Sequence, residues 1–390
     1  MALTLRQTPI RFVITLLGVA GALSLTGCGG FFQCEGKTSC PSTGTGTTGT
    51  ASGDYAYISN NSTNANDLSV YDVSTGALNA LSSSPISLGY VPNAMVINPA
   101  STLMFVSNPA TGVINAYTIA SSGALTGGTA VANQIVSAMA VSQDNDYLYT
   151  LDLTSAGSVL AVYSIGTNGA LTAAAIPSIT LPLLGTSGAS IAVAPTGSNY
   201  LVVTLGTVGD VIVPLANDQL STTLSPLTIS IPSSTSPQGD FGAAIDSNNN
   251  VYFARTGQIA VYTVASDGSK WTSVTNTTAN STTGQGDRAI LVTGSYLYTA
   301  NETDGTISGF SFTSAGVLTP LTGSPYTAPT LVSALGVDNT GKYIVASGYS
   351  SSAGTKLYTI GSAGALTAAS VATATGTSTS NPVVIAMTQP

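Results

Sequence analysis

The sequence predicts an all-β chain whose main body, residues 54–390, is a seven-bladed β-propeller of four-stranded antiparallel blades. Three observations support this fold class. A turn-plus-leucine signature recurs seven times at intervals of 46 to 51 residues. Each interval divides into four short β-type runs, and the last run of the chain is of the type that begins the other intervals. Radial repetition of small sheets at such a period is typical of propellers.

The composition limits the chemistry that this chain can perform. Of its 390 residues 6% are charged and none is His, and the formal net charge is −8. Without His the chain has no Ser-His-Asp triad, no His-ligated metal and no imidazole proton shuttle. Nucleic acid is not an expected partner, because 8 Lys plus Arg offer few phosphate contacts. We expect neither a cofactor nor a metal site.

Residues 1–27 predict a signal peptide. Arg6 and Arg11 give a positive start, and residues 12–25 form an uncharged, largely apolar run. A helix of that run would reach about 21 Å, short of the roughly 30 Å hydrocarbon core of a bilayer. We therefore expect export rather than a permanent membrane span.

The predicted signal peptide ends in Leu25-Thr26-Gly27-Cys28, which resembles the lipobox of bacterial lipoproteins. That resemblance implies a lipid anchor on Cys28 and localisation in the bacterial cell envelope, with the membrane as a partner. Because Gly29 follows the cysteine, it implies the outer rather than the inner membrane. The alternative is an ordinary cleaved signal in which a cysteine falls here by chance.

Residues 28–53 predict a linker between the anchor and the folded body. Cys34 and Cys40 form either a disulfide, which an exported compartment permits, or a pair of free thiols. Residues 41–53 consist almost entirely of Gly, Thr and Ser, which is typical of a flexible tether.

The repeat is marked by a turn followed by leucine. In five strong copies of this motif the central residue is glycine, namely Ser74–Leu78, Ser121–Leu125, Thr167–Leu171, Ser314–Leu318 and Ser362–Leu366. Two weaker copies end at Leu220 and Trp271. Seven copies predict seven blades.

Each unit contains recognisable strand types, because β-branched and aromatic residues dominate between turn residues. The run before the turn is rich in Tyr and Val, as in 68–73, 114–119, 160–165, 259–264 and 357–360. The run preceding it has the pattern of YLYTAN, as in 55–60, 103–108, 147–152 and 296–301. Runs of small residues come first, as in 93–98, 137–142 and 333–339, and suit the crowded innermost strand.

The ends of the body predict how the ring closes. The body opens with a second-type run at Tyr55 and finishes with an innermost-type run at 382–388. The last strand should therefore complete the first blade.

These motifs resemble the lactonase-like seven-bladed propellers, also called the YVTN family, over residues 54–390. The resemblance rests on the runs ending in Asn60, Asn108 and Asn301, on the Tyr-containing third runs, on the Gly-Ala-Leu turns and on the hairpin 338–343. It implies the propeller fold and, as activity, hydrolysis of a sugar lactone. Arg255 and Arg288 are the only arginines after the signal peptide, which leaves little cationic capacity for a phosphate group.

The candidate site follows from strand direction. In an antiparallel blade the innermost strand begins on the same face as the second strand ends. Counting through the turn at 294–295 places Arg288 opposite Asn301 and Asp287 opposite Glu302. In the preceding unit Arg255 ends the second run and Asp240 begins the innermost run. The same count places Asp152, Asn60 and Asn108 around the rim of this face.

Two interpretations of this cluster remain open. Arg288 and Arg255 can donate hydrogen bonds to a carboxylate or carbonyl of a ligand, with Glu302 or Asp287 as acceptor or general base. Alternatively, both arginines form ion pairs with Asp287, Glu302 and Asp240 that fasten neighbouring blades.

The sequence favours a binding function over catalysis. The first hypothesis is a lipid-anchored module that binds a polar small molecule, a glycan or a surface protein. The alternative is a lactonase-like hydrolase at the channel mouth. The acidic and amide triplets 144–146 and 248–250 lie between the first and second runs, which predicts hairpin turns rather than calcium sites.

Overall fold

The computed structural model describes residues 53–62, 65–185, 188–231, 239–276, 283–349, 354–372 and 383–389. The predicted signal peptide (1–27), Cys28, Cys34, Cys40 and the tether before Gly53 lie outside these residues. Within the described ranges no helix has the length and apolar character needed to cross a membrane.

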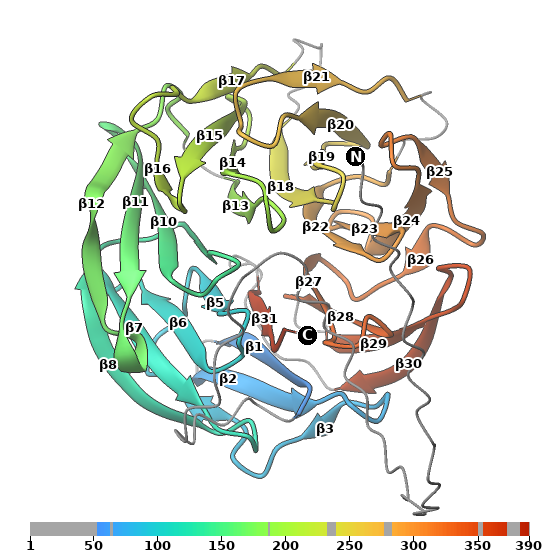
Figure 1. Cartoon of the computed structure of the whole chain (residues 1–390). Helices are drawn as coiled ribbons and strands as arrows, with labels where there is room; N and C mark the ends of the chain where they lie inside the picture. The colour runs from blue at the N-terminus through green and yellow to red at the C-terminus, as the bar shows by residue number, and fades with distance from the viewer. Residues whose placement is uncertain are drawn as a thin grey trace, which may run out of the picture. The chain divides into compact units, whose positions relative to one another are not determined.

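Seven antiparallel sheets follow one another around a central axis (Figure 1). In chain order, and from the innermost strand outward, they contain the following strands. Blade 1 has β31 (Ile385–Met387), β1 (Tyr55–Ser62), β2 (Ala65–Asp72), β3 (Asn79–Ala80) and β4 (Ile86–Ser87). Blade 2 has β5 (Met95–Ile97), β6 (Leu103–Asn108), β7 (Val113–Ile119) and β8 (Leu125–Asn133). Blade 3 has β9 (Ala138–Val141), β10 (Tyr147–Thr154), β11 (Gly157–Ile165) and β12 (Leu171–Thr180), with the 3-10 turn η1 (Thr167–Gly169) before β12. Blade 4 has β13 (Ala189–Val193), β14 (Tyr200–Leu205), β15 (Asp210–Ala216), β16 (Gln219–Leu220) and β17 (Leu227–Ile229). Blade 5 has β18 (Asp240–Ile245), β19 (Asn250–Arg255), β20 (Gln258–Val264) and β21 (Trp271–Ser273). Blade 6 has β22 (Asp287–Thr293), β23 (Tyr296–Asn301), β24 (Thr306–Phe312), β25 (Leu318–Pro320) and β26 (Tyr326–Thr327). Blade 7 has β27 (Val332–Val337), β28 (Tyr343–Gly348), β29 (Thr355–Ile360) and β30 (Leu366–Ala372).

The fold class is therefore confirmed as a seven-bladed propeller. Blades 1, 4 and 6 carry their outermost strand in two pieces, both paired with the third strand. The predicted second strands 103–108 and 296–301 match β6 and β23 residue for residue.

Ring closure also occurs as predicted. β31 pairs with β1, with Ala56 opposite Met387 and Ile58 opposite Ile385. The backbone N–H of Tyr55 donates to Thr388 Oγ1 at 2.9 Å, beside this pairing. The last strand thus supplies the innermost position of the first blade (Figure 1).

Two motifs recur in the sequence, a tyrosine in the second strand and a turn centred on glycine. These two motifs contact each other between adjacent blades. The glycines at the centres of the five strong turns have φ between 74° and 79°, a conformation that favours glycine. Tyr57 of blade 1 donates its hydroxyl to Gly123 O in the turn of blade 2 at 2.8 Å. Tyr298 of blade 6 makes the same bond to Gly364 O of blade 7 at 2.6 Å. Each tyrosine buries its ring and satisfies a turn carbonyl of the next blade, so the repeat encodes the blade interface.

Two faces are distinguished by strand direction. We call the face on which the innermost strands begin face A, and the face on which they end face B. Face A includes Asp240, Asp287 and the carboxyl ends of the second strands. Face B includes the hairpins between first and second strands. The triplets 144–146 and 248–250 lie in two of these hairpins, as predicted.

Candidate functional site

Face A of blades 5, 6 and 7 carries a β-bulge at the start of each innermost strand. The pairing shifts by one residue between Asp240 and Ala243, between Asp287 and Ala289, and between Val332 and Ala334. Bulges redirect side chains and are frequent beside functional sites. Here they release Phe241 and Arg288 from regular pairing at one sector of the face.

The bulge in β22 corrects the predicted register. Asp287 lies opposite Asn301, whereas the sequence count placed Arg288 opposite Asn301 and Asp287 opposite Glu302. The count assumed a regular ladder, and Arg288 is the extra residue that breaks it. Asp287 is therefore fully buried, while the Arg288 side chain is 35% exposed.

Arg288 is the centre of a cluster contributed by three blades. Its Nε donates to Glu302 Oε2 at 2.5 Å, directly after β23. Its guanidinium carbon lies 5.2 Å from the ring centroid of Phe241, from the bulge of blade 5. Tyr349, which follows β28 of blade 7, donates its hydroxyl to Glu302 Oε1. Phe241 and Tyr349 thus hold the Arg288–Glu302 pair from either side.

The electrostatics of the cluster keep Tyr349 a hydrogen-bond donor. Burial, and then the bond to Glu302, raise the pKa of Tyr349 to about 12. The phenol therefore stays protonated at neutral pH and donates to the carboxylate. Each oxygen of Glu302 thus accepts one hydrogen bond, Oε2 from Arg288 and Oε1 from Tyr349.

Arg255 is brought to the same face but is sequestered. It donates Nε to Asp240 Oδ1 at 2.8 Å and a terminal nitrogen to Asp240 Oδ2 at 2.5 Å. Arg255 is 3% exposed and Asp240 is not exposed. Asp210 lies next to this pair, and its pKa is raised well above the ordinary value by burial and by the neighbouring Asp240. This group is a buried structural ion pair with a third carboxyl, of raised pKa, beside it.

Asp287 has a structural environment as well. Its Oδ2 accepts hydrogen bonds from the Gly257 N–H at 2.9 Å and from Thr283 Oγ1 at 2.7 Å. Burial raises the pKa of Asp287 to about 7. The bond to Gly257 joins blade 6 to blade 5, so this carboxyl fastens two blades without an arginine.

Asn301 and Asn108 form hydrogen bonds with groups other than Arg288. Asn301 is buried and donates Nδ2 to Thr306 Oγ1 at 2.8 Å and to Ser308 Oγ at 2.9 Å. Asn108 Oδ1 accepts from two backbone N–H groups of its own turn, at 3.0 and 3.3 Å.

Asp152 and Asn60 complete the predicted rim. Asp152 is half-buried at face A of blade 3, and this burial raises its pKa. Asn60 is placed in β1, opposite Asp67, but its side chain lies outside the described part of the structure.

Both arginine ion pairs lie within a blade, between its first and second strands, and not between neighbouring blades. The residues that sequence reasoning missed are Phe241 and Tyr349. A signal for Tyr349 exists in the repeat, because it follows the second strand of blade 7 as Glu302 follows that of blade 6. Phe241 directly follows Asp240, but only the bulge sets it beside Arg288.

Metal binding finds no support in this part of the chain. Among the described residues no three or more Asp, Glu or Cys side chains form a group able to hold a metal ion.

Comparison with known proteins places this geometry in a family. The model of the family described as "Lactonase, 7-bladed beta-propeller" matches residues 121–376. The chain belongs to this lactonase family. A comparison with curated proteins finds no match.

Solved structures share the fold of this lactonase-family chain at low sequence identity. A periplasmic gluconolactonase of Pseudomonas aeruginosa is 14% identical with a TM-score of 0.66, covering 86% of this chain and 99% of that one. A candidate 6-phosphogluconolactonase of Bacteroides uniformis is 15% identical with a TM-score of 0.65 and the same coverage. A Lactobacillus plantarum protein is 18% identical with a TM-score of 0.63, again covering 86% and 99%. At these identities the likeness is one of fold.

Proposed function

We propose that this lactonase-family chain binds a small polar ligand bearing a carboxylate or carbonyl group, and that Arg288 on face A receives it. The observation that carries the proposal is the orientation of Arg288. Only its Nε is bonded to a described residue, and about a third of the side chain is exposed. Guanidinium groups bind carboxylates through paired, parallel N–H groups, and the terminal nitrogens of Arg288 offer such a pair.

The neighbours of Arg288 favour this role because they restrict its motion. The bond to Glu302 and the cation–π contact with Phe241 restrict the guanidinium before a ligand arrives. A pre-ordered side chain loses less conformational entropy on binding. Arg255 does not offer a ligand a comparable pair of N–H groups, because its Nε and one terminal nitrogen are bonded to buried Asp240.

The geometry favours binding over chemistry. A general base needs a free basic oxygen near the ligand. The Glu302 side chain is only 10% exposed and already accepts a hydrogen bond on each oxygen, and Asp287 is fully buried. Because the chain belongs to the lactonase family, the ligand class we propose is a sugar acid or related polyhydroxylated compound, bound without conversion.

The experiment is a calorimetric titration of D-gluconate and D-glucono-1,5-lactone into wild type and Arg288→Ala. The matched control is Lys342→Ala, which removes the same charge from an exposed position on the hairpin of blade 7 at face B. We expect the arginine variant to bind about tenfold or more weakly, as for loss of a charge-assisted bond. Equal affinity in wild type and Arg288→Ala, or no affinity in wild type for either compound, would reject the proposed site.

Lactone hydrolysis is the second candidate, and membership of the lactonase family is the observation that favours it. In this role Tyr349 would move away, and Glu302 would accept a proton from the water that attacks the lactone carbonyl carbon while Arg288 polarises the carbonyl. As the ring C–O bond then breaks, Glu302 would return the proton to the released ring oxygen, which gives the hydroxy acid. Hydrolysis of glucono-1,5-lactone by wild type and loss of that activity in Glu302→Gln would support it. Activity that survives Glu302→Gln would place the chemistry elsewhere, and an inactive wild type would leave the binding function.

We also propose that the chain is exported and anchored by lipid at Cys28. The support is the lipobox-like Leu25-Thr26-Gly27-Cys28 after an apolar run. Two or more acyl chains make membrane attachment effectively stable. Expression in a Gram-negative host followed by detergent phase partition tests this proposal, since Cys28→Ser should move the protein from the detergent to the aqueous phase. Equal partition of both forms would refute the anchor.

A further inference from the structure

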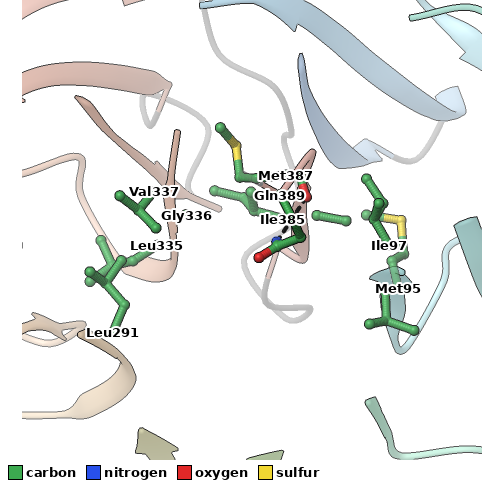
Figure 2. A pocket seen from close by; sticks show the side chains of 11 residues that line it. Met95, Ile97, Leu291, Leu335, Gly336, Val337, Ile385, Met387 and Gln389 are labelled. Carbon is green, nitrogen blue, oxygen red and sulfur yellow. Dashed lines mark hydrogen bonds between the residues drawn. The ribbon is translucent and has the colours of Figure 1, made fainter. Parts of the chain in front are cut away.

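The central channel opens at face B as two neighbouring cavities, of about 240 and 430 Å³. Both are lined by Val96, Ile97 and Gln389, so the two cavities are adjacent and meet at these residues. We call the two together the channel basin. Figure 2 shows its smaller part, with Leu291 and Leu335 on one side and Ile97 on the other. The larger part extends to the innermost strands of blades 3 and 4.

The side chains that line the channel basin are almost entirely apolar, while backbone groups of the innermost strands add polar surface between them. Among the described residues that line it, none carries a charged side chain, and Gln143 and Gln389 are the polar ones. The walls contain large aliphatic side chains such as Leu291, Leu335 and Ile191 rather than only small ones. The sequence predicted small side chains on the innermost strands because these strands are crowded. The bulky aliphatic side chains that surround the cavities are not explained by such crowding.

Methionine is concentrated in this basin. Three of the five methionines of the chain, Met95, Met139 and Met387, line it. Methionine side chains are flexible and polarizable, and they are frequent where a surface adapts to different apolar ligands.

Gln389 stands at the boundary between the two cavities. Its backbone N–H donates to Ser101 Oγ at 2.7 Å, which fixes the chain across the hairpin of blade 2. Its Nε2 donates to Met387 O at 3.1 Å (Figure 2). The side-chain carbonyl of Gln389 is thus placed as a hydrogen-bond acceptor at the boundary between the two cavities.

We infer that the channel basin is a second binding site, for a neutral small molecule whose apolar part packs against the aliphatic and methionine side chains. A charged ligand would lose its hydration without gaining a counter-charge, because no ionised side chain lines the basin. The larger cavity alone falls within the roughly 300 to 1,000 Å³ typical of small-molecule pockets. This site is independent of Arg288, which lies on the opposite face.

A pair of related fluorescent ligands tests the inference on the full chain. N-phenyl-1-naphthylamine is neutral, and 8-anilinonaphthalene-1-sulfonate is a similar ring system with a negative charge. We expect saturable binding of the neutral compound, with the anion bound about tenfold or more weakly because the basin offers no cation.

The matched variants are Val96→Trp, which fills space in both cavities, and Val317→Trp, which makes the same change at an exposed turn of blade 6. We expect Val96→Trp to weaken the neutral compound about tenfold or more and Val317→Trp to leave it unchanged. Wild type and both variants contain the same N-terminal segment. Any dye that binds to that segment therefore contributes equally to all three titrations.

Val193→Phe, in the larger cavity, provides a second filling variant if Val96→Trp does not fold. Undiminished binding in a folded filling variant would overturn the inference. So would equal affinity for the neutral and anionic compounds, or absence of saturable binding in wild type. Loss of gluconate binding in Arg288→Ala with unchanged binding of the neutral compound would show that the two sites are separate.

Discussion

Replacing Asp287 by Asn should remove a large part of the pH dependence of stability. Asp287 is fully buried, and burial raises its pKa from the ordinary value of 3.8 to about 7. Its folded-state pKa thus lies above that of the unfolded chain. The contribution of this carboxyl to stability is fully present below pH 3.8 and is lost as the pH rises through 7.

The size of the effect follows from that difference. A pKa difference of about 3, at about 1.4 kcal/mol for each pKa unit, corresponds to about 4 kcal/mol in the free energy of unfolding. Asn keeps an acceptor for the Gly257 N–H at the Oδ2 position, so the interblade bond persists. Relative to wild type, the Asp287→Asn variant should therefore gain stability steadily from pH 4 to pH 7. At about 2 °C per kcal/mol, the gain in Tm approaches about 8 °C.

Thermal unfolding of both proteins at intervals between pH 4 and pH 8 measures this difference. Asp54, whose pKa is also raised to about 7, is present in both proteins, so its contribution cancels. Asp267→Asn is the control, because the carboxyl of Asp267 is exposed and its pKa is lowered by Ser269. Parallel stability curves for wild type and Asp287→Asn would refute the argument that burial holds this carboxyl neutral.

Three further predictions concern the stability of the ring. Arg255→Met leaves Asp240 buried without its partner and should cost about 3 to 5 kcal/mol in urea unfolding, and a cost below 1 kcal/mol would contradict a buried pair. Tyr298→Phe removes the hydroxyl bond to Gly364 O and should cost about 1 to 2 kcal/mol, with unchanged stability showing that the interblade bond contributes nothing. Deletion of residues 385–390 removes β31 and leaves blade 1 without its innermost strand, so circular dichroism should show loss of the cooperative transition, whereas a wild-type melting curve would refute ring closure.

The features that sequence reasoning predicted well are those with local causes. A turn that requires positive φ selects glycine, so the centres at Gly76 and Gly364 were recognisable and marked each blade. Closure by the last strand was predictable too, since the residue composition of a run distinguishes an innermost strand from a second strand. The lactonase-family resemblance added the same fold from the same motifs.

The features that were missed depend on register and on contacts between blades. A bulge inserts one residue into a ladder without altering the hydrophobic pattern, so the position of Arg288 was off by one. Tyr349 reaches Glu302 from the next blade, at a separation of 47 residues. No count within one hairpin reveals that contact, and the aromatic support of Arg288 therefore emerges only in three dimensions.

The pairing of Tyr55 with Thr388 has a consequence for the connectivity of the chain. The backbone N–H of Tyr55 meets Thr388 Oγ1 at 2.9 Å, and the N–H of Thr388 meets Tyr55 O at 3.1 Å. A short peptide could join these neighbouring points, and the exposed turn at Asp267 could be opened instead. The resulting circular permutant would have a continuous first blade, and its two ends would meet in blade 5. The order of the blades along the chain can thus be changed while the propeller itself stays the same.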